Sequence, residues 1–109
     1  MSEANTLERL AALVHSRRND TSGKSYTTQL LTAGPERCAK KFGEEAVEAV
    51  IAAIGQDEAA LKAEAADVLY HLLVLLESRN VSLQDVLKVL EGRMGTSGLE
   101  EKASRTQQS

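Results

Sequence analysis

The sequence predicts an all-α fold, a helical bundle of four to five helices completed by homodimerisation. Proline occurs once, at Pro35, and glycine is absent from most of the length of the chain. Apolar residues recur at steps of three and four, which is the period of an amphipathic helix. Residues that favour helix N-termini stand ahead of several of these apolar runs.

The first helix is expected to begin after Asn5, which supplies an N-terminal cap, and to run to about Arg18. Its apolar face consists of Leu7, Leu10, Ala11 and Val14. Residues 19–24 are polar and turn-prone, so a loop is expected there. A short helix follows from Thr27 to Thr32.

A long helix is expected to start at Gly34-Pro35, because proline is tolerated at the first helical position, and to run to about Ile54. After a turn at residues 55–57, Asp57 caps the next helix, which runs from Glu58 to about Arg79. Ser82 caps a last helix that ends near Gly92. Its predicted buried stripe is Leu83, Val86, Leu87 and Leu90.

The chain has 109 residues, enough for one domain, which we place at residues 1–93, with a flexible C-terminal tail at residues 94–109. Residues 68–76 are apolar on nearly every face, and such a helix has to be buried all round. A chain of this size has few other helices to cover it. We therefore expect a second copy to do so, in a homodimer or a larger assembly.

Composition excludes several classes of protein. The 13 basic and 16 acidic side chains give a net charge of −3, which argues against a nucleic-acid-binding protein, and the scarcity of aromatic residues argues against base stacking. The apolar run is too short to span a membrane. A lone cysteine, Cys38, excludes an intrachain disulfide framework, and the N-terminus does not resemble a signal peptide. A soluble, cytoplasmic protein is expected.

The acidic excess is concentrated in residues 42–91, where five carboxylates stand in two neighbouring helices. Glu45 and Glu48 share one helical face, and Glu64 and Asp67 share another, while Glu44 is rotated away from its neighbours. Glu45 and Asp67 are equally far along the chain from Gln56, in the predicted turn, and so are Glu48 and Glu64. In an antiparallel helix hairpin the two pairs therefore lie at matched heights.

Four converging carboxylates repel one another unless a cation lies among them, and all-oxygen ligands select a hard cation such as Mg²⁺. Two other interpretations stand beside this one. The glutamates can be solvated on ordinary helix faces, or they can belong to a di-iron bundle, which requires Glu-x-x-His repeats. His71 follows Asp67 by four residues and does not fit that repeat, so we interpret it as a core histidine or a support for the metal site.

These residues resemble a known superfamily. Glu44-Glu45-x-x-Glu48 followed by Glu64-x-x-Asp67 is similar to the metal signature of the all-α, MazG-like nucleoside triphosphate pyrophosphohydrolases. Residues 25–27 (Ser-Tyr-Thr) and the Glu-Lys-Ala-Ser-Arg tail at residues 101–105 narrow the resemblance to the phosphoribosyl-ATP pyrophosphohydrolase family of histidine biosynthesis. Some relatives are fused to a zinc-dependent cyclohydrolase, for which this chain has neither the length nor the cysteines.

The resemblance implies an enzyme that hydrolyses phosphoribosyl-ATP to phosphoribosyl-AMP and pyrophosphate with Mg²⁺. It implies that Glu45, Glu48, Glu64 and Asp67 are metal ligands and that these four, together with Glu44, are catalytic. Glu44 is the weakest candidate for a direct ligand, and orienting a water or a neighbouring lysine is its alternative role.

Phosphates need basic partners, and the expected substrate-binding residues are Lys41, Arg17, Tyr26, Lys102 and Arg105. Each of these residues also has a purely structural alternative. Lys41 can form an ion pair with Glu45, and Arg17 can be a cation that stabilises a helix C-terminus. Tyr26 can pack at a loop–helix junction, and the last two can belong to a solvated tail.

Two alternative functions remain open at the level of sequence. One is a house-cleaning pyrophosphatase that acts on nucleoside triphosphates, with the same carboxylates but no need of the tail. The other is a non-catalytic helical dimerisation module, in which the acidic cluster binds a structural cation.

Overall fold

The computed structural model describes residues 6–95, and these residues form helices and turns without any β-strand. The elements are α1 (Thr6–Ser16), the short 3-10 helix η2 (Arg17–Asn19), α2 (Tyr26–Ala33), α3 (Pro35–Gly55), α4 (Glu58–Ser78) and α5 (Leu83–Met94). The predicted all-α class is therefore confirmed. The expected cap Asn5 and the tail beyond Gly95 lie outside the described residues.

Local capping chemistry sets most of the helix boundaries. Pro35 occupies the first turn of α3, as predicted. Asp57 caps α4, because its Oδ1 accepts a hydrogen bond from Ala60 N at 2.9 Å, and Ser82 caps α5 through a bond from Asp85 N at 3.1 Å. Ser25 caps α2 in the same way and starts that helix slightly earlier than expected.

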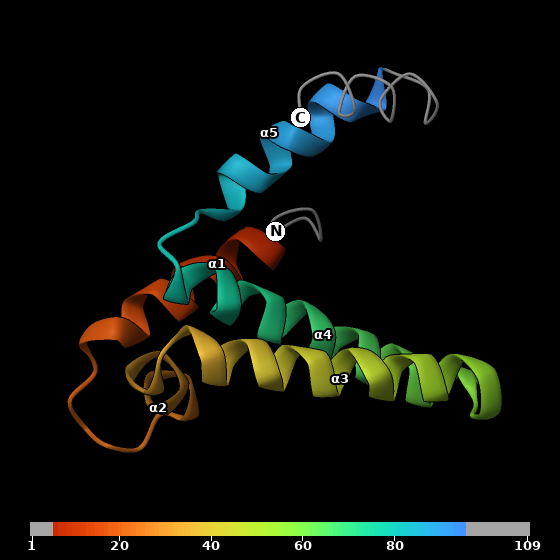
Figure 1. Ribbon diagram of the computed structural model, residues 1–109, viewed down its shortest axis with the longest axis horizontal. Helices are drawn as coiled ribbons and strands as arrows, with labels where there is room; N and C mark the ends of the chain where they lie inside the picture. The colour runs from red at the N-terminus through yellow and green to blue at the C-terminus, as the bar shows by residue number, and fades with distance from the viewer. Residues whose placement is uncertain (1–5, 96–109) are drawn as a thin grey trace.

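The two long helices α3 and α4 lie side by side and antiparallel, and they form the body of the fold (Figure 1). α1 and α2 pack against one end of this pair. The core lies at that end and consists of Val14, Leu30, Cys38, Leu73, Val74 and Leu83. The predicted apolar face of α1 is confirmed, since Val14 is buried and Leu7, Leu10 and Ala11 pack against the core.

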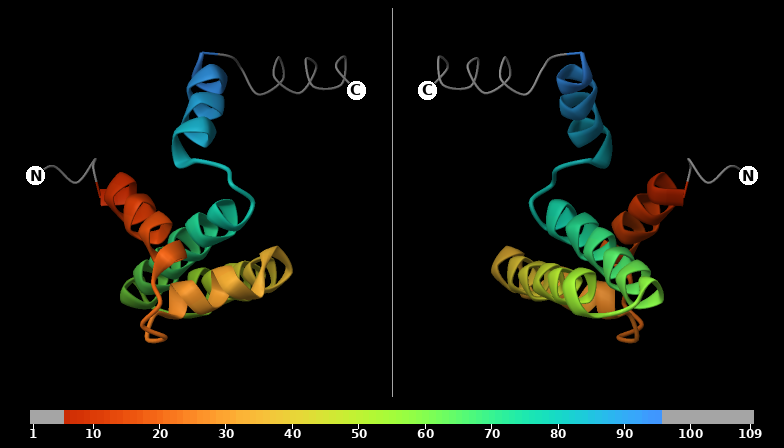
Figure 2. Two further views of the ribbon diagram at one scale, coloured as in Figure 1. Left: turned by 90° about the vertical axis from the view of Figure 1, so that its left-hand side faces the viewer. Right: turned by 90° about the vertical axis from the view of Figure 1, so that its right-hand side faces the viewer.

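The last helix, α5, projects away from the α3–α4 pair, which both views of Figure 2 show. Only Leu83 of its predicted buried stripe is buried, whereas Leu90 is exposed together with Val89 and Met94. The predicted stripe is therefore confirmed at Leu83 and at Leu87, which packs against the core, and is wrong at Leu90. The sequence period predicts the helical face correctly, but beyond Leu87 the helix projects away from the other described elements.

Residues 68–76 are covered within the chain to a greater extent than expected. His71, Leu73 and Val74 are buried, although Leu69 stays exposed. A further uncovered apolar surface lies on the second half of α3, where an apolar stripe is formed by Val47, Val50, Ile51 and Ile54. None of the described helices is long and apolar enough to cross a membrane.

Candidate metal and substrate site

Three acidic side chains from the α3–α4 hairpin converge on one point. Glu45 comes from α3, and Glu64 and Asp67 come from successive turns of the facing helix α4. Each offers a carboxylate oxygen, and these oxygens all lie within 4.8 Å of one another. The turn at Gln56-Asp57 brings them together, because it reverses the chain so that positions equally far from it face each other.

The buried part of this cluster belongs to Glu64. Its Oε2 is inaccessible to solvent and has no hydrogen-bond partner among the described residues. A buried carboxylate oxygen without a donor is unfavourable, so it calls for a cation or a donor from outside this set. Glu45 is half-buried and Asp67 is exposed, which leaves the cluster open on one side.

The negative charges within the cluster repel one another. Burial raises the pKa of Glu64, and the neighbouring negative charges of Asp67, Glu45 and Glu48 raise it further. Such mutual repulsion is relieved when a positive ion binds. Three oxygen donors of this kind suit a hard divalent cation that keeps part of its water shell, as Mg²⁺ does.

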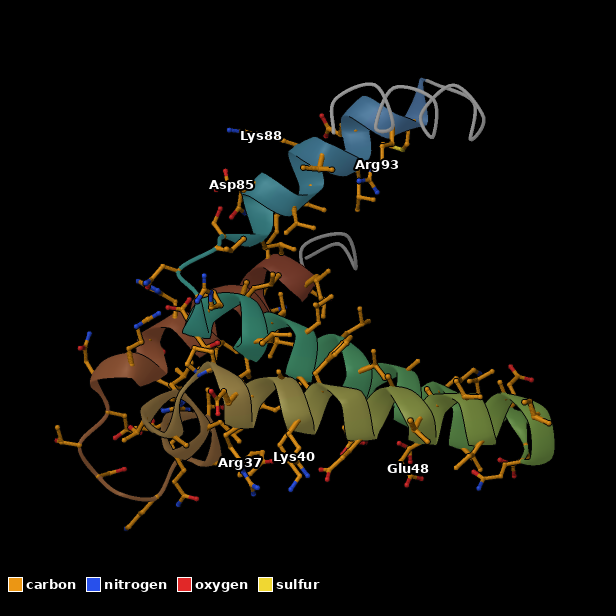
Figure 3. The ribbon with its side chains drawn as sticks, viewed as in Figure 1. Arg37, Lys40, Glu48, Asp85, Lys88 and Arg93 are labelled. Carbon is orange, nitrogen blue, oxygen red and sulfur yellow. The ribbon has the colours of Figure 1, made fainter. Side chains whose placement is uncertain are left out.

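The other two predicted acidic residues lie beside this point of convergence. Glu48 is exposed one turn further along α3 and projects from the edge of α3 opposite to α1 and α5 (Figure 3). It is close enough to act on Glu64 electrostatically, but it is not part of the converging group. Glu44 forms an ion pair with Lys41, with Oε1 3.3 Å from Nζ.

Lys41 is thus held by Glu44 instead of Glu45, the partner considered from the sequence. Its side chain is largely covered, and the hydrogen bond to Glu44 raises the pKa of its ammonium, so Lys41 stays charged beside the carboxylates. Arg37 and Lys40 extend along the same edge of α3 as Glu48 (Figure 3). Two basic side chains therefore precede Glu48 along this edge of α3.

His71 is bonded to the backbone of α4 and contacts two aromatic rings. Its Nδ1–H donates to the backbone oxygen of Asp67 at 2.9 Å, so in the neutral ring Nε2 is an acceptor. That Nε2 is buried and has no partner among residues 6–95. The ring meets Tyr70 and Tyr26 edge-on, with centroids 4.9 and 6.2 Å apart. The burial of this ring fits the first of the two alternatives, a core histidine, and a supporting role for the metal site stays a prediction.

The two tyrosines also line a cavity of about 400 Å³. The predicted residues Arg17 and Tyr26 both line it. Arg17 pairs with Asp20 at 3.6 Å within η2 and the loop after it. Lys102 and Arg105 lie outside the described residues.

Sequence reasoning missed three residues of this region: Tyr70, Lys24 and Asp20, which also line the cavity. Tyr70 follows Asp67 by three residues and so shares its helical face, a signal that was available. Lys24 and Asp20 stand in a loop, where no period indicates which side chains converge.

Comparison with known proteins places the chain among relatives of one kind. A sequence profile of the family described as "Phosphoribosyl-ATP pyrophosphohydrolase" matches residues 7–94. Proteins called phosphoribosyl-ATP pyrophosphatase are similar over 99 residues, which is 91% of this chain. They include one from Cereibacter sphaeroides (60% identical, 96% of its length), one from Rhodobacter capsulatus (58%, 96%) and one from a Jannaschia species (56%, 97%).

Proposed function

This chain belongs to the phosphoribosyl-ATP pyrophosphohydrolase family, and from that premise we propose that it hydrolyses phosphoribosyl-ATP to phosphoribosyl-AMP and pyrophosphate, a step of histidine biosynthesis. The relatives' names supply the substrate. The structural observation that carries the proposal is the convergence of Glu45, Glu64 and Asp67 around a buried carboxylate oxygen without a partner.

We assign Mg²⁺ as the cofactor, with Glu45, Glu64 and Asp67 as ligands and Glu48 as the fourth predicted acidic residue beside them. The donor set consists of oxygen atoms only, and the site is open on the side of Asp67, which suits an ion that also binds substrate phosphates. When bound, the ion supplies charge neutralisation for the phosphates and lowers the pKa of a coordinated water.

The chain's own residues then position the substrate. Cleavage of the anhydride between the α- and β-phosphates takes up one water and releases pyrophosphate, and it depends mainly on alignment and charge stabilisation. Lys41, held by Glu44, keeps a positive charge beside the carboxylates and can contact a phosphate oxygen. Glu44 thus orients a lysine, which is the alternative role that the sequence left open for it.

The remaining predicted contacts extend this proposal. Arg17 and Tyr26 bind substrate from the adjoining cavity, and Lys102 and Arg105 bind phosphates from the tail, as the family resemblance implies. The reaction takes place in the cytoplasm, a location that a chain with one free, buried cysteine tolerates.

We further propose that two copies associate. The apolar stripe on α3 (Val47, Val50, Ile51 and Ile54) is left uncovered by residues 6–95, and α5 carries a second apolar surface with Val89 and Met94. Exposed apolar patches of this kind on a small protein indicate an interface. Both surfaces belong to one chain, so a second copy offers each of them a partner.

Activity of a charge-neutralised variant tests the metal site. Asp67→Asn is expected to reduce pyrophosphate release at least a hundredfold, while Asp85→Asn, the same change on the remote helix α5 (Figure 3), leaves turnover within twofold of the unmodified protein. Retained turnover in a folded Asp67→Asn protein would show that the cluster is not the metal site.

The oligomeric state is tested by light scattering at micromolar concentration. The chain mass is 11.8 kDa, so a dimer is expected near twice that value, and Val50→Glu is expected to shift the mass toward one chain. A monomeric mass for the unmodified protein contradicts the association.

A further inference from the structure

The cavity beside the two tyrosines differs chemically from the carboxylate cluster. It is an open cavity lined by residues of α1, the loop at residues 20–25, the start of α2 and one residue of α4. Leu10, Leu13 and Val14 supply an apolar part of the lining, and most of the other lining residues are polar. Its volume of about 400 Å³ falls within the range of small-molecule sites.

The polar part of the lining carries two cations and one carboxylate. Arg17 and Asp20 are 3.6 Å apart, a loose pair that leaves other guanidinium N–H groups of Arg17 available. The ammonium of Lys24 is exposed and forms no ion pair with any residue of the described part of the chain. The hydrogen bond from Ser22 N–H lowers the pKa of Asp20, so Asp20 remains an ionised acceptor.

This combination fits a sugar phosphate. Two cations suit a phosphate dianion, and a carboxylate accepts hydrogen bonds from ribose hydroxyl groups. The apolar part of the lining packs against the carbon atoms of the sugar. A bare phosphate would make no use of Asp20, and a neutral sugar would make no use of Lys24.

The cavity and the carboxylate cluster share α4, because the lining residue Tyr70 stands one turn from Asp67. Tyr26 and Tyr70 line it, and both of their rings contact His71, which is hydrogen-bonded to the backbone of Asp67. Tyr70 and Asp67 are three residues apart, which is about 4.5 Å along a helix. Tyr70 is fixed by a hydrogen bond with Thr27. One elongated ligand can therefore reach both places across the aromatic rings.

We propose that this cavity binds the phosphoribosyl group of the substrate, with Lys24 and Arg17 contacting its phosphate and Asp20 its ribose hydroxyls. The inference rests on the proposed function, because it assigns one part of the same substrate. Phosphoribosyl-ATP has a triphosphate at one end and a phosphoribosyl group on its purine. The carboxylate cluster serves the first, the cavity serves the second, and together they select this substrate over ATP.

The experiment compares two ligands that share the triphosphate and differ in the phosphoribosyl group. KM for phosphoribosyl-ATP and the inhibition constant of ATP are measured with Mg²⁺ for the unmodified protein and for Lys24→Gln, with Lys88→Gln on α5 as the matched control. Lys24→Gln is expected to raise KM about tenfold, to change kcat and the ATP inhibition constant less than twofold, and to match the control in its circular dichroism spectrum.

Equal weakening of both ligands would overturn the inference, because the cavity would then serve the triphosphate, and so would an unchanged KM. A second readout separates this inference from the proposed function. Ribose 5-phosphate is titrated against the unmodified protein and Lys24→Gln, and chemical shifts are followed by NMR. Binding that depends on Lys24 supports the cavity assignment even if phosphoribosyl-ATP is not cleaved, and absence of binding to both proteins contradicts it.

Discussion

Replacing Glu77 by glutamine is expected to destabilise the fold where η2, which contains the cavity residue Arg17, packs against the end of α4. The side chain of Glu77, 15% exposed, accepts hydrogen bonds from Arg18 Nε and from His15 Nδ1, the latter at 3.0 Å. Arg18 also donates to the backbone oxygen of Glu77 and, at 2.7 Å, to Asn80 Oδ1. This group of contacts ties η2, and with it Arg17, to the end of α4.

The size of the effect follows from these contacts. A hydrogen bond to a charged group contributes about 1.5–3 kcal/mol, and a neutral one about 1 kcal/mol. His15 is 73% exposed, so its pair contributes little. Glutamine can still accept one neutral bond from Arg18. The expected loss is about 1–2 kcal/mol, which lowers Tm by roughly 5–15 °C in a domain of this size.

The same residue predicts a dependence of stability on pH. Burial alone would raise the pKa of Glu77, but the hydrogen bonds from Arg18 and His15 outweigh it, so its pKa is lowered. A lowered folded-state pKa gives stability that is fully present above the unfolded value of about 4.3 and is lost as the pH falls through the folded value. The difference between the unmodified protein and Glu77→Gln is therefore expected to shrink below about pH 4.

Thermal unfolding followed by circular dichroism measures both effects, at equal protein concentrations because association shifts Tm. Glu58→Gln is the matched control, since the ion pair of Glu58 with Lys62 is exposed on both sides and contributes little. A Tm for Glu77→Gln that equals the control at pH 7, or a difference that persists unchanged at pH 3, would refute the reasoning.

Three further predictions concern other parts of the fold. Glu64→Gln is expected to raise the Tm of the metal-free protein, because it removes a charge that is repelled by neighbouring carboxylates and has one oxygen buried. It is also expected to abolish the rise in Tm on adding Mg²⁺, and a lower metal-free Tm would contradict repulsion within the cluster. Leu30→Ala, at a side chain that is 3% exposed, is expected to lower the free energy of unfolding by about 2–5 kcal/mol in urea, and a loss under 1 kcal/mol would be at odds with its burial. Ser82→Ala is expected to speed amide hydrogen exchange in the first turn of α5, since it removes about 1 kcal/mol of capping, while exchange in α4 stays unchanged.

The sequence predicted best those features that depend on residues close to one another in the chain. Pro35, Asp57 and Ser82 place helix starts because caps act within one turn. The convergence of Glu45 with Asp67 follows from a turn of known position between two regular helices. Here the number of residues between a side chain and the turn determines its position along the hairpin.

Features that depend on tertiary approach could not be predicted. Nothing local indicates that α5 leaves the other helices, so Leu90 was expected to be buried and is exposed. Lys41 contacts Glu44 instead of Glu45, a choice made by side-chain rotamers. The cavity depends on a hydrogen bond between Thr27 and Tyr70, which are 43 residues apart. No periodic pattern in the sequence predicts such a contact.

The central claim is that a carboxylate cluster on the α3–α4 hairpin supports Mg²⁺-dependent hydrolysis of phosphoribosyl-ATP. Pyrophosphate release from phosphoribosyl-ATP and from deoxynucleoside triphosphates, each with Mg²⁺ and with a chelator, tests it most directly. We expect rapid release from phosphoribosyl-ATP with Mg²⁺, loss of release with the chelator, and little release from the deoxynucleotides. Faster cleavage of the deoxynucleotides, or undiminished cleavage of phosphoribosyl-ATP in the chelator, would contradict the account.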